Sequence, residues 1–158
     1  MAIQAMASMA ILTLPVMAPA IAESLRISAT LIGVYVGLVY CGAMSTSLIA
    51  GHLVSRYGAI RVSQVCLLLC GFGLALSAIP SIAAVSLGGL LIGFGYGPIT
   101  PASSHLLAKT TPHHRVALIF SIKQTGVPLG GMLAGAIVPG LVLAIGSQSA
   151  LLSVGLAT

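Results

Sequence analysis

Charged side chains are almost absent from this sequence. The 158 residues include six basic side chains and one acidic one, or 4% charged residues, against 58% hydrophobic residues. Soluble domains carry about 25% charged residues, because a fold in water needs a charged surface. So few charges cannot cover a soluble fold of this length, and we expect most of the protein surface to face lipid.

Acidic groups are the scarcest of all, because Glu23 is the single carboxylate and the chain contains no Asp. Pairing with Arg26, three residues on, is its expected role. Catalysis requires an acid, base, nucleophile or metal constellation, and none is visible. A Gly-rich phosphate loop followed by lysine is also missing. We therefore expect neither an enzyme nor an ATP-driven pump, and no cofactor.

Cysteine is sparse as well, and Cys41, Cys66 and Cys70 all fall in apolar runs with no second pair of metal ligands. We therefore expect no metal site and interpret the cysteines as small buried residues. The few basic residues are scattered and have no aromatic residues between them. This pattern argues against nucleic acid as a partner.

Long apolar runs with short polar breaks make up the rest of the chain. In lipid a spanning segment must satisfy its own backbone hydrogen bonds, and the runs lack the alternation of barrel strands, so they predict helices. The sequence predicts an all-α integral membrane fold of five complete transmembrane helices and the start of a sixth. Because the last run stops at Thr158 before it could cross, we expect a truncated chain. The approximate spans are 3–22, 30–50, 62–79, 83–108, 116–145 and the partial span 149–158.

Basic residues gather after every second span. Arg56 and Arg61 follow the second span, Lys109 and Arg115 follow the fourth, and the other side has only Arg26. The positive-inside rule places these basic segments and the N-terminus in the cytoplasm. We expect a multi-pass protein of the cytoplasmic (inner) membrane, with the lipid bilayer as a partner.

Glycine and proline form the other pattern in the apolar runs. Small residues four apart let helices approach closely in lipid. Prolines remove backbone hydrogen bonds and can kink a helix, and a freed carbonyl can face a substrate or only mark a kink. The residues expected to serve helix packing and kinks are Gly93, Gly97, Pro98, Gly126, Pro128 and Gly130.

The stretch GHLVSRYGAIR, residues 51–61, carries two arginines and a histidine between long runs without a charge. It resembles the loop between helices 2 and 3 of the major facilitator superfamily, with Gly51, Arg56, Gly58 and Arg61 on the family pattern. The resemblance implies a cytoplasmic gate here. Ser55 stands where the family usually has Asp, which removes the carboxylate that helps to lock the two halves in the family.

Two further stretches strengthen the resemblance. Residues 91–104 look like helix 4 of many bacterial members, although Gly89 stands near the place of an arginine that some relatives use in proton coupling. Residues 123–131 resemble the glycine-proline helix 5, one residue out of step with the antiporter signature. The overall pattern is similar to bacterial transporters of cyanate and small organic anions. The resemblance runs from about Ile3 to Leu143 and covers the first of the family's two six-helix halves.

Lys123 is the charge of most interest, because an ionisable group inside a membrane is a functional hypothesis by default. Binding of a substrate anion and snorkelling to the headgroups are the two interpretations of Lys123. Helices 1, 2, 4 and 5 line the cavity in the family, so other polar side chains are candidates for the pathway, with packing or interfacial anchoring as the alternative. The full set of pathway candidates is Lys123, Gln124, Thr125, Thr100, Tyr35 and Tyr40.

The resemblance implies the N-terminal half of a secondary transporter that moves a small solute by alternating access. Lys123 and the lack of embedded carboxylates favour a small organic or inorganic anion. The implied partners are this substrate, a coupling proton or ion, and a C-terminal half of the same transporter. The alternative is a non-transporting half-size assembly subunit or an inert gene remnant.

Overall fold

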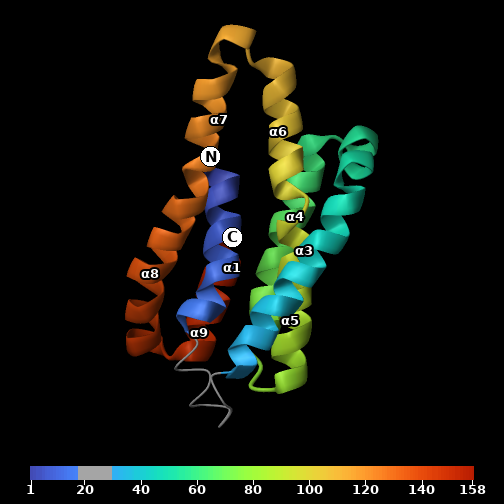
Figure 1. The fold of residues 1–158 in the computed structure, drawn as a ribbon. Coiled ribbons are helices and arrows are strands. Elements are labelled where there is room, and N and C mark those ends of the chain that lie inside the picture. The colour runs from blue at the N-terminus through green and yellow to red at the C-terminus, as the bar shows by residue number, and fades with distance from the viewer. Residues whose placement is uncertain (18–29) are drawn as a thin grey trace.

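The computed structural model describes residues 1–17 and 30–158, and all regular elements within those residues are helices (Figure 1). The predicted all-α fold is therefore confirmed. The end of the predicted span 3–22 and the expected pair of Glu23 and Arg26 lie outside the described residues. The helices are α1 (Ala2–Val16), α3 (Thr30–Tyr57), α4 (Ala59–Ser77), α5 (Ile82–Tyr96), α6 (Ile99–Thr110), the 3₁₀ turn η1 (His113–Arg115), α7 (Val116–Gln124), α8 (Gly126–Ile145) and α9 (Ser147–Ala157).

Four helical stretches of the described residues are long and apolar enough to cross a membrane. They comprise Gly33–Tyr57, Ala59–Ser77, Ile82–Thr110 and Val116–Ile145, and the shorter α1 is also apolar. A spanning helix needs about 20 apolar residues. Lengths and composition thus agree with a multi-pass membrane protein.

The connection between α3 and α4 is shorter than the predicted loop. The helix α3 continues past residue 50 to Tyr57, and α4 begins at Ala59. Gly58 alone separates them, with a positive φ of 83° that favours glycine. Because this residue reverses the chain, the stretch 51–61 is helical on both sides of Gly58 instead of forming an extended loop.

Proline divides two of the long spans into shorter helices. The span 82–110 breaks between α5 and α6 at Gly97 and Pro98, and the span 116–145 breaks at Thr125, shortly before Pro128. Pro101 has no N–H for the carbonyl of Gly97, and that carbonyl accepts a hydrogen bond from Ser47 Oγ of α3 at 3.1 Å. A neighbouring helix thus satisfies the backbone group that the proline frees.

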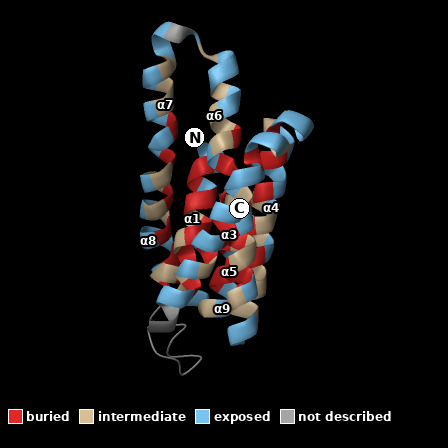
Figure 2. Cartoon of the chain, turned by 45° about the vertical axis from the view of Figure 1, so that its right-hand side comes forward, coloured by how far each residue is buried: buried red, intermediate tan, exposed pale blue. Residues whose placement is uncertain are grey.

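The core lies where two helix groups meet. The helix α5 packs against α3 and α4, and α1 packs against α8. Side chains of both groups share one buried cluster, which includes Leu14, Val39, Leu74, Ile92 and Val138. Figure 2 shows the buried residues concentrated on α1 and the inner faces of the bundle, with much of α7 exposed.

Both basic segments lie at one end of the molecule. The turn between α3 and α4 and the connection between α6 and α7 are at the same end, the upper end in Figure 1. The opposite end carries the turn between α4 and α5 and that between α8 and α9. The helices therefore alternate in direction, as the predicted topology requires.

Candidate functional site

Lys123 is the buried charge of the described residues. It lies near the end of α7, just before the break at Thr125, and is 5% exposed. Its Nζ donates hydrogen bonds to the backbone carbonyl of Thr100 at 3.2 Å and to Ser104 Oγ at 2.8 Å. The same nitrogen lies 5.9 Å from the centroid of the Phe120 ring. Lys123 thus points into the bundle toward α6.

The partners of Lys123 are all neutral. Two oxygens of α6 accept its hydrogen bonds, and residues 1–17 and 30–158 contain no Asp or Glu. A charge held inside a membrane is costly and normally pairs with another charge or with backbone carbonyls. The described residues supply the carbonyl and the hydroxyl but no counter-ion.

Thr100 joins Lys123 to the first helix. Its hydroxyl accepts a hydrogen bond from Gln4 Nε2 of α1 at 3.3 Å, while its carbonyl accepts from Lys123. Thr100 is exposed and lines a hollow of about 490 Å³ between α3 and the α5–α6 break, together with Ser47 and Tyr96. The polar group is therefore built from α1, α6 and α7, and one of its members reaches an open hollow.

Gln4, Ser8 and Ser104 are polar residues near this site that the sequence analysis did not select. Gln4 and Ser8 are buried, at 2% and 0% exposed, on a mostly apolar helix. Gln4 Oε1 and Ser8 Oγ have no hydrogen-bond partner among the described residues. Their four-residue spacing on one face of α1 is the signal that could have identified them. Ser104 likewise follows Thr100 by one helical turn.

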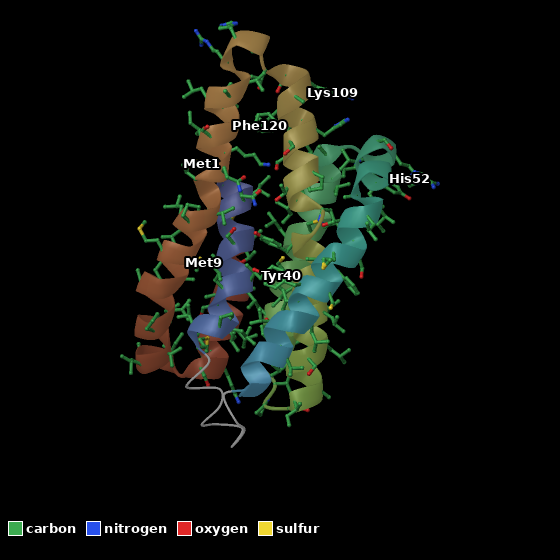
Figure 3. All side chains as sticks on the ribbon, in the orientation of Figure 1. Met1, Met9, Tyr40, His52, Lys109 and Phe120 are labelled. Carbon is green, nitrogen blue, oxygen red and sulfur yellow. The ribbon has the colours of Figure 1, made fainter. Side chains whose placement is uncertain are left out.

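The other predicted pathway residues lie apart from Lys123. Gln124 and Thr125 are exposed, and Thr125 Oγ1 donates to the carbonyl of Ile122 at 2.7 Å. Tyr40 is 54% exposed and lies midway along α3, away from Met1 and Phe120 (Figure 3). Tyr35 is buried, and its hydroxyl has no partner among the described residues. Of the six candidates, Lys123 and Thr100 are in direct contact.

Gly89 explains where the ring of Tyr35 lies. A Cβ added to Gly89 would be 2.6 Å from Cε2 of Tyr35, a distance too short for any real side chain. The ring of Tyr35 therefore occupies the space beside α5 at the position where some members of the resembled family place an arginine.

The predicted gate residues surround the turn at Gly58. Gly51, Ser55 and Arg56 are exposed on the last turns of α3, and Arg61 is exposed in the first turn of α4. Ser55 Oγ donates to the carbonyl of His52 at 2.9 Å, within its own helix. The guanidinium of Arg56 lies 5.4 Å from the centroid of the Tyr57 ring. His52, near this turn, is labelled in Figure 3.

The predicted packing glycines lie in two close helix contacts. A Cβ on Gly93 or Gly97 would collide with the carbonyl of Val39 or Ala43 of α3. A Cβ on Gly130 would collide with the carbonyl of Ala5 of α1. Pro98 is buried at the start of α6, whereas Pro128 is exposed in the first turn of α8.

Gly126 makes a further close contact between α8 and the start of α1. A Cβ there would lie 2.9 Å from the carbonyl of Met1 and 3.0 Å from Cβ of Gln4. The glycines thus allow backbones to approach closely, as small residues do in lipid. Gly126 in particular lets the first helix carry Gln4 up to the turn that follows Lys123.

Metal binding has no visible basis in residues 1–17 and 30–158. No group of three or more His, Cys, Asp or Glu side chains gathers there. Cys66 and Cys70 are buried among apolar neighbours, and Cys41 is exposed. The chemistry of the described site is therefore hydrogen bonding and charge, supplied by Lys123 and its neighbours.

Comparison with known proteins gives one family and one relative. The protein-family model described as Major Facilitator Superfamily matches residues 1–158. A relative named multi-drug resistance efflux pump PmrA homolog, from Lactococcus lactis subsp. lactis (strain IL1403), is 32% identical over 114 residues. That match covers 70% of this chain and 28% of the relative. No solved structure matches the chain. The resemblance to the major facilitator superfamily is confirmed, whereas neither match supports the narrower likeness to transporters of cyanate and small organic anions.

Proposed function

Because the chain belongs to the Major Facilitator Superfamily, we propose that it forms the N-terminal half-domain of a secondary transporter. Alternating access would come from rocking of this half against a C-terminal half around a site near the membrane midplane. The lipid bilayer, the C-terminal half and a coupling proton or ion are its expected partners. We expect the inner membrane as its location, with the N-terminus in the cytoplasm, and no enzymatic activity.

The observation that carries this proposal is the buried Lys123. A lysine in a spanning helix whose partners among the described residues are all neutral oxygens is expensive for a merely structural residue. A transporter gains from such a group, because a substrate can supply the missing charge. The alternative of an assembly subunit or gene remnant offers no reason for a cation at this place.

We propose a small organic or inorganic anion as the substrate class. Lys123 supplies positive charge, and the described residues offer no carboxylate that would bind a cation. The relative's name gives a second candidate, export of drugs. The narrower likeness to cyanate transporters has no support in that relative. An anion and a cationic dye therefore belong in the same substrate panel.

The turn at Gly58 is the proposed cytoplasmic gate. Ser55, Arg56 and Arg61 are exposed around it and available to a second half of the transporter. The hydroxyl of Ser55 is turned to its own helix, so Arg56 and Arg61 would provide the attraction. The acidic partners would have to come from the other half.

Transport by vesicles tests the proposal. The gene product, purified from its source cell and reconstituted, would be assayed for uptake of labelled formate, nitrate and glycolate and of a cationic dye. We expect anion uptake that falls about tenfold or more in Lys123→Gln, because a hydrogen bond to a charged group contributes about 1.5–3 kcal/mol. Lys109→Gln, on the exposed end of α6, is the matched control and should transport normally.

Each outcome has a defined meaning. Dye transport that does not depend on Lys123 would replace the anion by a drug. Vesicles that take up no member of the panel, with the protein folded and inserted, would overturn the proposed transport function.

A further inference from the structure

Gln4 carries an acceptor that the described residues do not use. The side chain is 2% exposed, its Nε2 donates to Thr100 Oγ1 at 3.3 Å, and its buried Oε1 has no partner. A buried polar atom without a hydrogen bond is destabilising. On a helix packed inside the bundle against α8 and α4, such an atom points to a donor that arrives from outside the chain.

Close packing holds Gln4 in this place. Its Cβ would lie 3.0 Å from a Cβ added to Gly126, so a larger residue at 126 would push α1 away. Gly126 begins α8, two residues after α7 ends at Gln124 and three residues after Lys123. The two polar side chains therefore come together because α1 lies against the start of α8.

Lys123 carries a donor that is also unused. An ammonium group has three N–H donors, and the structure gives its Nζ two acceptors, the carbonyl of Thr100 and Ser104 Oγ. Gln4 binds the hydroxyl of the same Thr100. A charged donor and a neutral acceptor thus belong to two side chains that are both hydrogen-bonded to Thr100.

The ligand that satisfies both groups is an anion with a donor of its own. Its carboxylate would accept from Lys123 Nζ, and a neighbouring hydroxyl would donate to Gln4 Oε1. A plain anion would leave Oε1 unpaired, and a neutral or cationic drug would leave the lysine without a counter-charge. Thr100, to which both groups are hydrogen-bonded, also lines the hollow of about 490 Å³.

We propose that Gln4 and Lys123 bind the substrate at two points and that the substrate is a small hydroxy carboxylate. This inference rests on the proposed transport function and adds the requirement for a hydroxyl beside the carboxylate. Gln4 is the residue that selects for that hydroxyl, and Lys123 binds the charge.

Glycolate and acetate form the matched probes, because they differ by one hydroxyl. Isothermal titration of the purified gene product with each should show glycolate binding about tenfold tighter, the value of one added hydrogen bond in a buried site. Gln4→Met keeps the length of the side chain and removes the acceptor. It should lower glycolate affinity to that of acetate and leave acetate binding unchanged.

Ser8→Ala is the control variant, since Ser8 lies one turn further along the same buried face of α1. It should keep the preference for glycolate. Equal affinities for the two probes in the wild-type protein, or no binding of either, would overturn the inference. This comparison needs no variant, so a Gln4→Met protein that folds poorly does not weaken the test.

The failure of this inference is distinct from failure of the proposed function. Equal binding of glycolate and acetate, with anion uptake in vesicles that depends on Lys123, would remove the role of Gln4 and keep the anion transporter. Absence of uptake for every solute would instead remove the transport function itself.

Discussion

Two helix pairs of this protein use the same packing device in different settings. Between α3 and α5, Gly93 and Gly97 meet the carbonyls of Val39 and Ala43. Between α1 and α8, Gly126 and Gly130 do the same against the start of α1. In both pairs the glycines are four residues apart, and both pairs bring backbones into direct contact.

The side chains beside these contacts differ. Val39, Ala43 and Ile92 near the first contact are buried and apolar, and Thr46 beside Gly97 donates to carbonyls of its own helix. Gln4 and Ser8 are buried in the second, and Gln4 Oε1 and Ser8 Oγ have no partner among the described residues. Glycine spacing therefore indicates where helices approach closely, and buried polar atoms without a partner distinguish the second contact from the first. Three substitutions, each with its own control, test helix packing and ligand binding separately.

Gly93→Ala should have the largest effect, and on stability alone. The added methyl would collide with the carbonyl of Val39, which belongs to a rigid backbone, so α5 must move away from α3. Overpacking of this kind costs about 1–3 kcal/mol. The fraction of protein that stays monodisperse after heating measures this loss of stability.

Gly135→Ala is the control for this substitution. Nothing lies within 4 Å of a Cβ at Gly135 of α8. Alanine is better than glycine in a helix by about 1 kcal/mol, so this variant should be as stable as the wild type or more so. If both variants lose equal stability, the contact with Val39 does not matter.

Gly130→Ala should affect stability and ligand binding together. Its methyl would meet the carbonyl of Ala5 and lie 2.7 Å from Cβ of Ser8, which pushes α1 from α8. Gln4 would move with α1, so we expect a stability loss of about 1–3 kcal/mol and a weaker preference for glycolate over acetate. Heating and the titration described above measure the two effects.

Gly131→Ala is the neighbouring control. A methyl there would lie 3.1 Å from the end of the Leu12 side chain, which can rotate away. This variant should behave as the wild type in both measurements. A Gly130→Ala protein with reduced stability and an unchanged preference would show that the position of α1 does not set the site.

Much of the fold follows from the sequence because lipid restricts the choices. A chain with 4% charged residues and long apolar runs can only form helices or a closed barrel in a membrane, and the missing alternation excludes the barrel. The family followed from local motifs around Gly58 and Pro128. Helix ends were less predictable, because a single residue with positive φ replaced the expected loop between α3 and α4.

The site was only half predictable for a physical reason. Lys123 stands out in any apolar run, because a charge there is rare. Gln4 does not stand out in the sequence, since a single amide near the start of a helix is common at the membrane–water interface. Its importance comes from α1 and α8 lying together, and Gln4 and Gly126 are far apart in the sequence. The pairing of helices, which composition does not reveal, decides which polar residues meet.

Ser104→Ala should have the smallest of the three effects on stability and the one most specific to Lys123. It removes one of the two acceptors of Lys123 Nζ and leaves the backbone of α6 in place. A hydrogen bond to a charged group contributes about 1.5–3 kcal/mol when buried, and this one is partly open, so we expect about 1 kcal/mol. Ser103→Ala removes the hydrogen bonds from Oγ to the carbonyls of Ile99 and Thr100 within α6, leaves both acceptors of Lys123 Nζ in place, and should change stability by less than about 0.5 kcal/mol. With two N–H donors then free, Lys123 in Ser104→Ala should bind acetate and glycolate more tightly than in Ser103→Ala, because the ligand no longer shares the ammonium with Ser104.

Tighter binding together with lower stability would show that Ser104 occupies a donor of Lys123 that an anion would otherwise use. Weaker binding of both probes would instead mean that Ser104 positions the ammonium for the ligand.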